Sequence, residues 1–198
     1  IRVAANPAHR HAAIRALANT AVTSEDLAQL RELARDDVDL RWRVLVRQAA
    51  RDDVDSAEIE ALSSRDPDPD SWVRALAVNS ARPDPAAKEE TWRAIVDDFR
   101  VPMGSLGQLR RAFWQRGQRE LLAPYASRYL EALPRLHTLG MLPALALSTA
   151  MYPAAGVGEG FPARAERAAK EPGVSPVVAS AVVEQTDQLR RMLVARAM

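Results

Sequence analysis

Apolar residues recur every three or four positions along most of this chain, which is the spacing of a helix that buries one face. Leu27, Leu30 and Leu33 show this spacing clearly. No segment has a convincing strand pattern. We therefore expect an all-α protein of about 10–12 helices. The apolar pattern places them near residues 1–20, 23–34, 40–51, 56–65, 69–82, 85–99, 106–113, 139–152 and 176–197, with a further helix pair after Gly117.

Two copies of one helical pattern overlay without gaps between Asp39 and Phe99. A shift of 31 residues aligns six identical residues, since Asp39, Arg43, Leu45, Ala50, Arg51 and Asp53 fall on Asp70, Arg74, Leu76, Ala81, Arg82 and Asp84. A repeat of this length, made of two helices and two short joints, is typical of stacked helix pairs. The sequence predicts an α-solenoid of antiparallel helix pairs, a superhelix of the HEAT or armadillo kind.

The joints between the predicted helices carry residues that start helices. Asp39 and Asp55 precede helix-forming runs, where a carboxylate accepts hydrogen bonds from the free N–H groups of the first turn. Glu58 stands three residues after Asp55, in the spacing of a capping box. Asp84 followed by Pro85 gives a cap and then a residue suited to the first helical position. These signals set the predicted helix starts.

The second half of the chain is less regular than the first. We expect a kink or break at Pro124 and at Pro134, because proline lacks the N–H that an inner helical turn needs. Residues 139–152 are apolar nearly all round, which predicts a helix buried on most sides. Residues 153–175 are predicted to be irregular and to precede the last long helix. We treat 1–198 as one helical repeat domain.

Three tryptophans occupy apolar stripes, and one stands at a predicted helix end. We expect Trp42, Trp72 and Trp92 to lie in the core, and Trp114 to be more exposed.

Composition excludes several classes of function. The 27 basic and 26 acidic residues leave a net charge of +1, which argues against nucleic acid as a partner. There is no cysteine, no apolar run of 18 residues and no pattern of a signal peptide. These features predict a cytoplasmic protein that binds no membrane. The sequence begins at Ile1 without an initiator methionine, and we expect it to be a fragment of a larger chain.

Arginine and glutamine side chains are frequent on the second helix of each predicted pair. In stacked pairs these helices line the concave side, where guanidinium groups could hold the carboxylates of a peptide. The alternative is that these arginines pair with the Asp and Glu residues of the joints. The candidate peptide-contacting residues are Arg41, Arg43, Arg47, Arg74, Arg110, Arg111 and Gln115.

Two other motifs do not support a site. His9 and His11 are two residues apart and would point to different sides of a helix, with no acidic ligand placed nearby. The glycines between 156 and 160 follow no strand and precede no lysine, so a flexible loop explains them better than a phosphate-binding loop. We predict no metal-binding, cofactor-binding or catalytic residue in this chain.

Several short segments, in order and with their spacing, resemble one known domain. They are Leu40-Arg41-Trp42-Arg43, Ser80-Ala81-Arg82-Pro83 with Lys88 and Thr91-Trp92, Ala112-Phe113-Trp114-Gln115, Gly117-Gln118 and Leu121-Leu122-Ala123-Pro124-Tyr125. Together they resemble the C-terminal helical domain of bacterial zinc aminopeptidases of the aminopeptidase N type. The resemblance is best over about residues 25–135.

The resemblance implies that the catalytic machinery lies in an upstream domain. That domain carries an H-E-x-x-H helix and binds zinc, whereas none of His9, His11 and His137 begins such a motif here. The resemblance further implies that this chain encloses and gates a peptide chamber, with the upstream domain and peptide substrates as its partners. The alternative is a free-standing HEAT-like scaffold that binds a protein or peptide in its groove.

Overall fold

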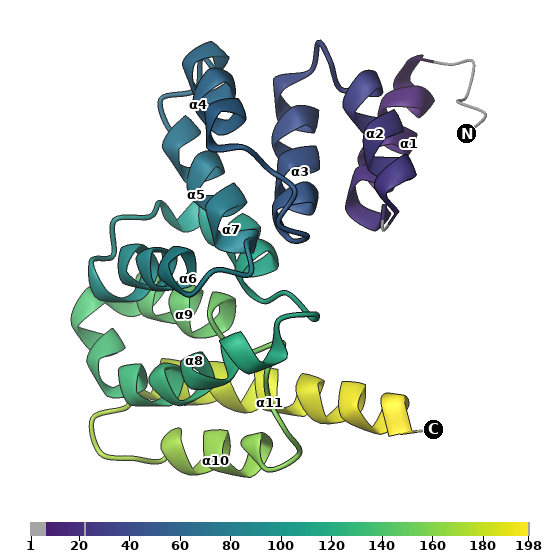
Figure 1. Cartoon of the computed structure of the whole chain (residues 1–198). Helices are drawn as coiled ribbons and strands as arrows, with labels where there is room; N and C mark the ends of the chain where they lie inside the picture. The colour runs from purple at the N-terminus through teal and green to yellow at the C-terminus, as the bar shows by residue number, and fades with distance from the viewer. Residues whose placement is uncertain (1–6, 22, 198) are drawn as a thin grey trace. The chain divides into compact units, whose positions relative to one another are not determined.

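The computed structural model describes residues 7–21 and 23–197, with side-chain detail for 12–18, 21 and 23–195. This part of the chain is helical and contains no strand, as the apolar spacing predicts (Figure 1). Its eleven α-helices are α1 Pro7–Thr20, α2 Ser24–Leu33, α3 Val38–Ala49, α4 Ser56–Arg65, α5 Ser71–Ala81, α6 Pro85–Trp92, α7 Leu106–Phe113, α8 Arg119–Ala132, α9 Met141–Ala150, α10 Phe161–Ala168 and α11 Pro176–Ala197.

Three short helical segments of other types connect these helices. A π-helical turn, Arg93–Asp97, continues α6, and 3₁₀ turns cover Met103–Ser105 and Leu133–Leu139. The chain divides into two compact units, Ile1–Lys88 and Glu89–Met198.

In the first unit, α3 is the helix on which the others pack. It contacts α1, α2, α4 and α5, and Figure 1 shows these helices side by side. Ile14, Leu27, Leu30, Leu40 and Val44 from α1, α2 and α3 form one buried cluster. The apolar stripes of consecutive helices are therefore buried on one another, which is the main source of their stability.

The 31-residue repeat has a structural counterpart inside this unit. Arg51 follows α3 and donates to the hydroxyl of Ser24 at the start of α2, at 3.2 Å. Arg82 follows α5 and donates to the carbonyl of Val54, just before α4. Arg51 thus ties the end of α3 to the start of α2, and Arg82 ties the end of α5 to the residues before α4.

Side chains cap helices at two of the three residues for which the sequence predicts a cap, Asp55 and Asp84, and also at Thr23. Thr23 accepts from the N–H of Asp26, Asp55 from Ala57 and Asp84 from Ala86. The predicted cap at Asp39 is wrong, because Asp37 takes that place and accepts from the N–H of Leu40. Asp39 then lies in the first turn of α3, where its charge still favours the helix N-terminus.

The second unit is built on aromatic contacts. Phe113 of α7 packs edge-on against Trp114 and Tyr125, with ring centroids 5.0 Å apart in each pair. The ring centroid of Trp92 lies 5.3 Å from that of Tyr125 and 6.1 Å from that of Phe113. Around this group α9 packs on α7 and α11, and α10 packs on α8 and α11. The aromatic cluster fixes α6, α7 and α8 relative to one another.

Several expectations for this unit need correction. Residues 153–175 include α10, a helix the sequence analysis missed. Phe99 is not part of a helical stripe, because its φ of 50° lies in the left-handed region and ends the helical run. The chain breaks into a 3₁₀ turn around Pro134, whereas α8 runs through Pro124.

The helix α9 is not buried on most sides, contrary to its uniform apolar sequence. Ala144 and Leu147 are buried, but Met141 and Leu142 are 67% and 62% exposed.

Two tryptophan predictions are also wrong. Trp72 is 38% exposed, whereas Trp114 is 6% exposed because Phe113 covers it. Trp42 and Trp92 are buried as predicted.

Candidate functional site

Two of the four candidate arginines of the first unit, Arg41 and Arg74, are held in ion pairs. Arg74 of α5 contacts three carboxylates, at 3.0 Å for Asp66, 2.9 Å for Asp68 and 2.7 Å for Asp39. The Asp66 side chain is only 2% exposed and also accepts from the indole N–H of Trp42 at 2.7 Å. This network joins α3, the end of α4 and α5, so Arg74 serves the fold.

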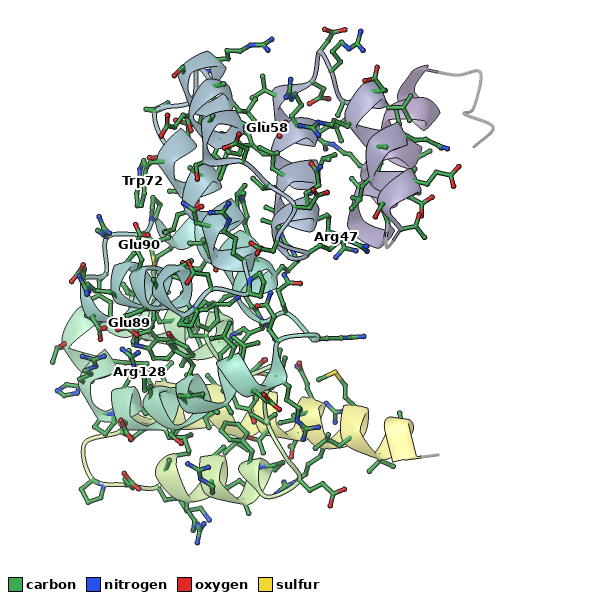
Figure 2. All side chains as sticks on the ribbon, viewed as in Figure 1. Arg47, Glu58, Trp72, Glu89, Glu90 and Arg128 are labelled. Atoms are coloured by element: carbon green, nitrogen blue, oxygen red, sulfur yellow. The ribbon has the colours of Figure 1, made fainter. Side chains whose placement is uncertain are left out.

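Arg41 is engaged in the same way. Its guanidinium contacts one oxygen of Glu58 at 3.2 Å, and Arg31 contacts the other oxygen. Glu58 thus serves two arginines of neighbouring helices instead of completing a capping box with Asp55. Glu58 is labelled in Figure 2.

Arg43 differs from Arg74 although the repeat places the two at equivalent positions. Arg43 is exposed and makes no ion pair with any residue that the structure describes. The reason is local, since Arg35 stands where Asp66 stands one repeat later. Arg47, on the next turn of α3, is half-buried (Figure 2).

The candidate residues of the second unit lie at the turn between α7 and α8. Gln115 donates to the carbonyls of Arg111 and Ala112, both at 2.9 Å, so its amide closes the C-terminal end of α7. Arg111 is exposed and Arg110 is partly buried. Two more arginines, Arg116 and Arg119, follow in the same turn and are exposed. We name Arg110, Arg111, Arg116 and Arg119 together the joint arginines.

Sequence reasoning missed Arg116 and Arg119 as members of this group. A signal existed, because residues 106–120 hold four arginines against a single acid, Glu120. The seven predicted residues divide between the two units. Arg41, Arg43, Arg47 and Arg74 belong to the first unit, and Arg110, Arg111 and Gln115 to the second.

A second charged cluster of this unit was also missed. Arg128 of α8 lies over the rings of Trp92 and Tyr125, 5.1 and 5.2 Å from their centroids, and forms a two-pronged ion pair with Glu89. Figure 2 shows Glu89 and Arg128 facing one another. The hydrogen bonds from Arg128 lower the pKa of Glu89, while burial, helped by Glu89, raises the pKa of Tyr125 to about 12. Both partners are satisfied, so this cluster stabilises α6 against α8.

Lys88 is the unusual cation of the first unit. Its side chain is fully buried and its ammonium donates to the carbonyl of Ser80 near the end of α5. A cation is favourable at that end of a helix, but burial lowers the pKa of Lys88 to about 7. Lys88 therefore closes α5 at an electrostatic cost.

An apolar pocket of about 210 Å³ opens in the second unit beside α7 and α9. The side chains that line it are all apolar, and they come from Ile95, Phe99, Val101, Met103, Leu106, Leu139, Pro143 and Leu147. These side chains supply no acid, base or nucleophile.

The described residues do not fit a zinc centre. No group of three or more His, Cys, Asp or Glu side chains among them is arranged to hold a metal ion. The side chains of His9 and His11 lie outside the described part of the chain. Within the helices described, none is both long and apolar enough to cross a membrane.

The chain is similar to part of a known protein. The chain is 32% identical, over 165 aligned residues, to aminopeptidase N of Streptomyces lividans. The match covers 76% of this chain and 19% of that protein, so the chain spans about a fifth of the relative's length. The sequence matches no protein-family model. The similarity therefore extends over most of this helical chain but relates it to a small part of a larger peptidase.

Proposed function

We propose that this chain is the non-catalytic, C-terminal helical domain of a zinc aminopeptidase of the aminopeptidase N type. The similarity to aminopeptidase N over 76% of the chain carries this proposal. The helical architecture supports it as well. Zinc and the hydrolytic residues would then belong to an upstream part of the same polypeptide.

The role we assign to the domain is to enclose and gate the chamber in which that upstream part cleaves peptides. Closure of such a domain excludes water and limits which substrates reach the metal. In the first unit, the packing of α3 on the helices before and after it, with repeated arginine ties, supports a HEAT-like solenoid. In a solenoid, the second helices of the pairs would line the substrate side.

Two proteins test this proposal, the chain 1–198 and the longer polypeptide encoded by the reading frame upstream of Ile1. We expect aminopeptidase activity and one bound zinc in the longer protein, and neither in 1–198. Cleavage of peptides or one tightly bound zinc in 1–198 would contradict the proposal. Activity is measured as release of the N-terminal residue from unblocked peptides, with N-acetylated peptides as the control.

The alternative is a free-standing scaffold that binds a protein or peptide in its groove. The exposed apolar residues of α9, Met141 and Leu142, favour it, because exposed apolar patches often mark interaction surfaces. A start codon near Ile1, with no upstream H-E-x-x-H motif, would decide for the scaffold.

A further inference from the structure

We propose that the joint arginines, Arg110, Arg111, Arg116 and Arg119, form a binding surface for the carboxylates of acidic peptides. This inference rests on the proposed function in one respect, since it takes peptides as the ligands of the domain. It narrows the seven candidate residues to the α7–α8 turn and adds two residues that the sequence analysis did not select.

The joint arginines differ from most other described arginines in having no partner among the described residues. None of the four guanidinium groups forms an ion pair or hydrogen bond with another residue in the part of the chain that the structure describes. The positive charge of Arg110 lowers the pKa of Tyr129 and so opposes burial, which raises it. The four cations stand within ten residues of sequence, so a short segment of the chain offers several unpaired guanidinium groups to a carboxylate ligand.

Helix stability explains the positions of only two of the four joint arginines. Arg110 and Arg111 lie in the last turn of α7, where cations favour the helix dipole. Arg119 is the first residue of α8, where a cation is unfavourable, and Arg116 lies in the turn before it. The nearest acid in sequence, Glu120, pairs with neither. A ligand accounts for the position of Arg119 better than the helix does.

The backbone beneath the joint arginines is held firmly. Phe113 and Trp114 are buried directly under the turn, and Gln115 closes α7 with two hydrogen bonds. A Cβ at Gly107 would lie 3.8 Å from Nη1 of Arg111, so the Arg111 guanidinium reaches back over a position without a side chain. These contacts hold the end of α7, which carries Arg110 and Arg111, in place before a ligand binds.

The chemistry of the surface favours a peptide over a nucleic acid. Arginine presents a planar fork that binds a carboxylate or a phosphate through two hydrogen bonds. Single-stranded nucleic acids also require exposed aromatic faces for stacking, and here Phe113, Trp114 and Tyr125 are buried. The basic group is short, and the whole chain has a net charge of only +1. A peptide with two or three acidic side chains matches a surface of this size and charge.

Fluorescence anisotropy of labelled peptides on the chain 1–198 tests the proposal. The probes are an N-acetylated peptide with four glutamates, the same peptide with glutamines, and a single-stranded oligonucleotide of equal charge. We expect the glutamate peptide to bind, the glutamine peptide not to bind, and binding to weaken as salt rises. The double variant Arg111→Gln/Arg119→Gln should weaken binding about three- to tenfold.

The matched control is Arg167→Gln. Arg167 is likewise exposed, makes no ion pair with a described residue and lies in the last turn of a helix, α10. This variant should bind the glutamate peptide like the parent chain, and circular dichroism should show all variants folded. Equal losses in both variants, equal binding of the glutamine peptide, or no binding at all would overturn the proposal. Preference for the oligonucleotide would overturn it too.

The binding assay needs no catalysis, so its outcome is separate from that of the proposed function. An active longer polypeptide whose helical part ignores acidic peptides would overturn the carboxylate surface alone. Peptide binding by 1–198 without any upstream peptidase would overturn the aminopeptidase proposal alone.

Discussion

Arg74 and the joint arginines are opposite cases, because one is held in ion pairs and the others are not. Arg74 is surrounded by Asp39, Asp66 and Asp68, and the nearly buried Asp66 also holds Trp42. The joint arginines have neither carboxylates nor other hydrogen-bond partners among the described residues. The difference separates an arginine that builds the fold from arginines that remain open to a ligand.

The comparison also shows that a repeat pattern does not fix the role of its residues. Arg43 and Arg74 occupy equivalent positions 31 residues apart, yet only Arg74 has partners in the described structure. The role changes because the residue that corresponds to Asp66 in the earlier repeat is Arg35. Asp39 likewise corresponds to Ala8, so the earlier repeat lacks the counterparts of two of the three carboxylates that hold Arg74.

The largest effect on the free energy of unfolding is expected at Phe113, in the core next to the joint arginines. Phe113 is fully buried and touches Trp92, Trp114 and Tyr125. Phe113→Ala should lower the free energy of unfolding by about 3–5 kcal/mol, because it leaves a cavity under the turn. Urea denaturation followed by circular dichroism measures this loss. Leu142→Ala, on the exposed face of α9, is the control, and a similar loss in both would refute a special role for Phe113.

The next largest effect on stability is expected at Arg74, with Arg43 as the comparison. Arg74→Met leaves the buried Asp66 carboxylate without its main cation and should cost about 2–3 kcal/mol. Arg43→Met should change stability by less than about 0.5 kcal/mol, because Arg43 is an exposed residue without a described partner. Urea midpoints of the two variants give the comparison. Equal costs would mean that the network at Asp66 contributes nothing.

Lys88 should make the stability of the folded chain depend on pH. Its pKa is about 7 in the folded chain and 10.5 in the reference state, so the unfolded chain binds the extra proton between these values. The free energy of unfolding should therefore rise with pH from about 7 to 9, by roughly 1 kcal/mol per pH unit from this group. In Lys88→Met that part of the slope should vanish. Parallel pH profiles for parent and variant would show that Lys88 is not desolvated.

The smallest effect on stability is expected at the joint arginines themselves. Arg111→Gln removes a cation that favours the C-terminal end of α7, and Arg119→Gln removes one that disfavours the start of α8. The double variant should therefore stay within about 0.5 kcal/mol of the parent in urea denaturation. A loss above about 1.5 kcal/mol would assign these arginines to the fold, as for Arg74.

Local signals predicted much of the fold because the relevant partners are close in sequence. The caps at Asp55 and Asp84 depend on N–H groups two residues away. The cap at Asp37 was misplaced to Asp39, since two carboxylates near one helix start are hard to tell apart by sequence. Helix α10 is short, but Gly160 and Pro162 at its start were a usable signal.

The candidate site was harder to predict, because partners distant in sequence decide which arginines remain open. Arg41 meets Glu58, 17 residues away, and no rule of spacing joins them. Burial was equally hard to foresee for tryptophan. Trp72 lies at the start of α5 and is exposed, while Trp114 follows α7 and is covered by Phe113. Tertiary packing, rather than local pattern, settled each of these cases.

Amide hydrogen exchange of 1–198, with and without the N-acetylated glutamate peptide, tests the contrast between the two arginine groups most directly. We predict slower exchange in the segment 106–122, which carries the joint arginines, and unchanged exchange in the segment 66–74, where Arg74 is already paired. Protection of 66–74 with none in 106–122 would contradict the account, because the peptide would then bind where the structure leaves no arginine open.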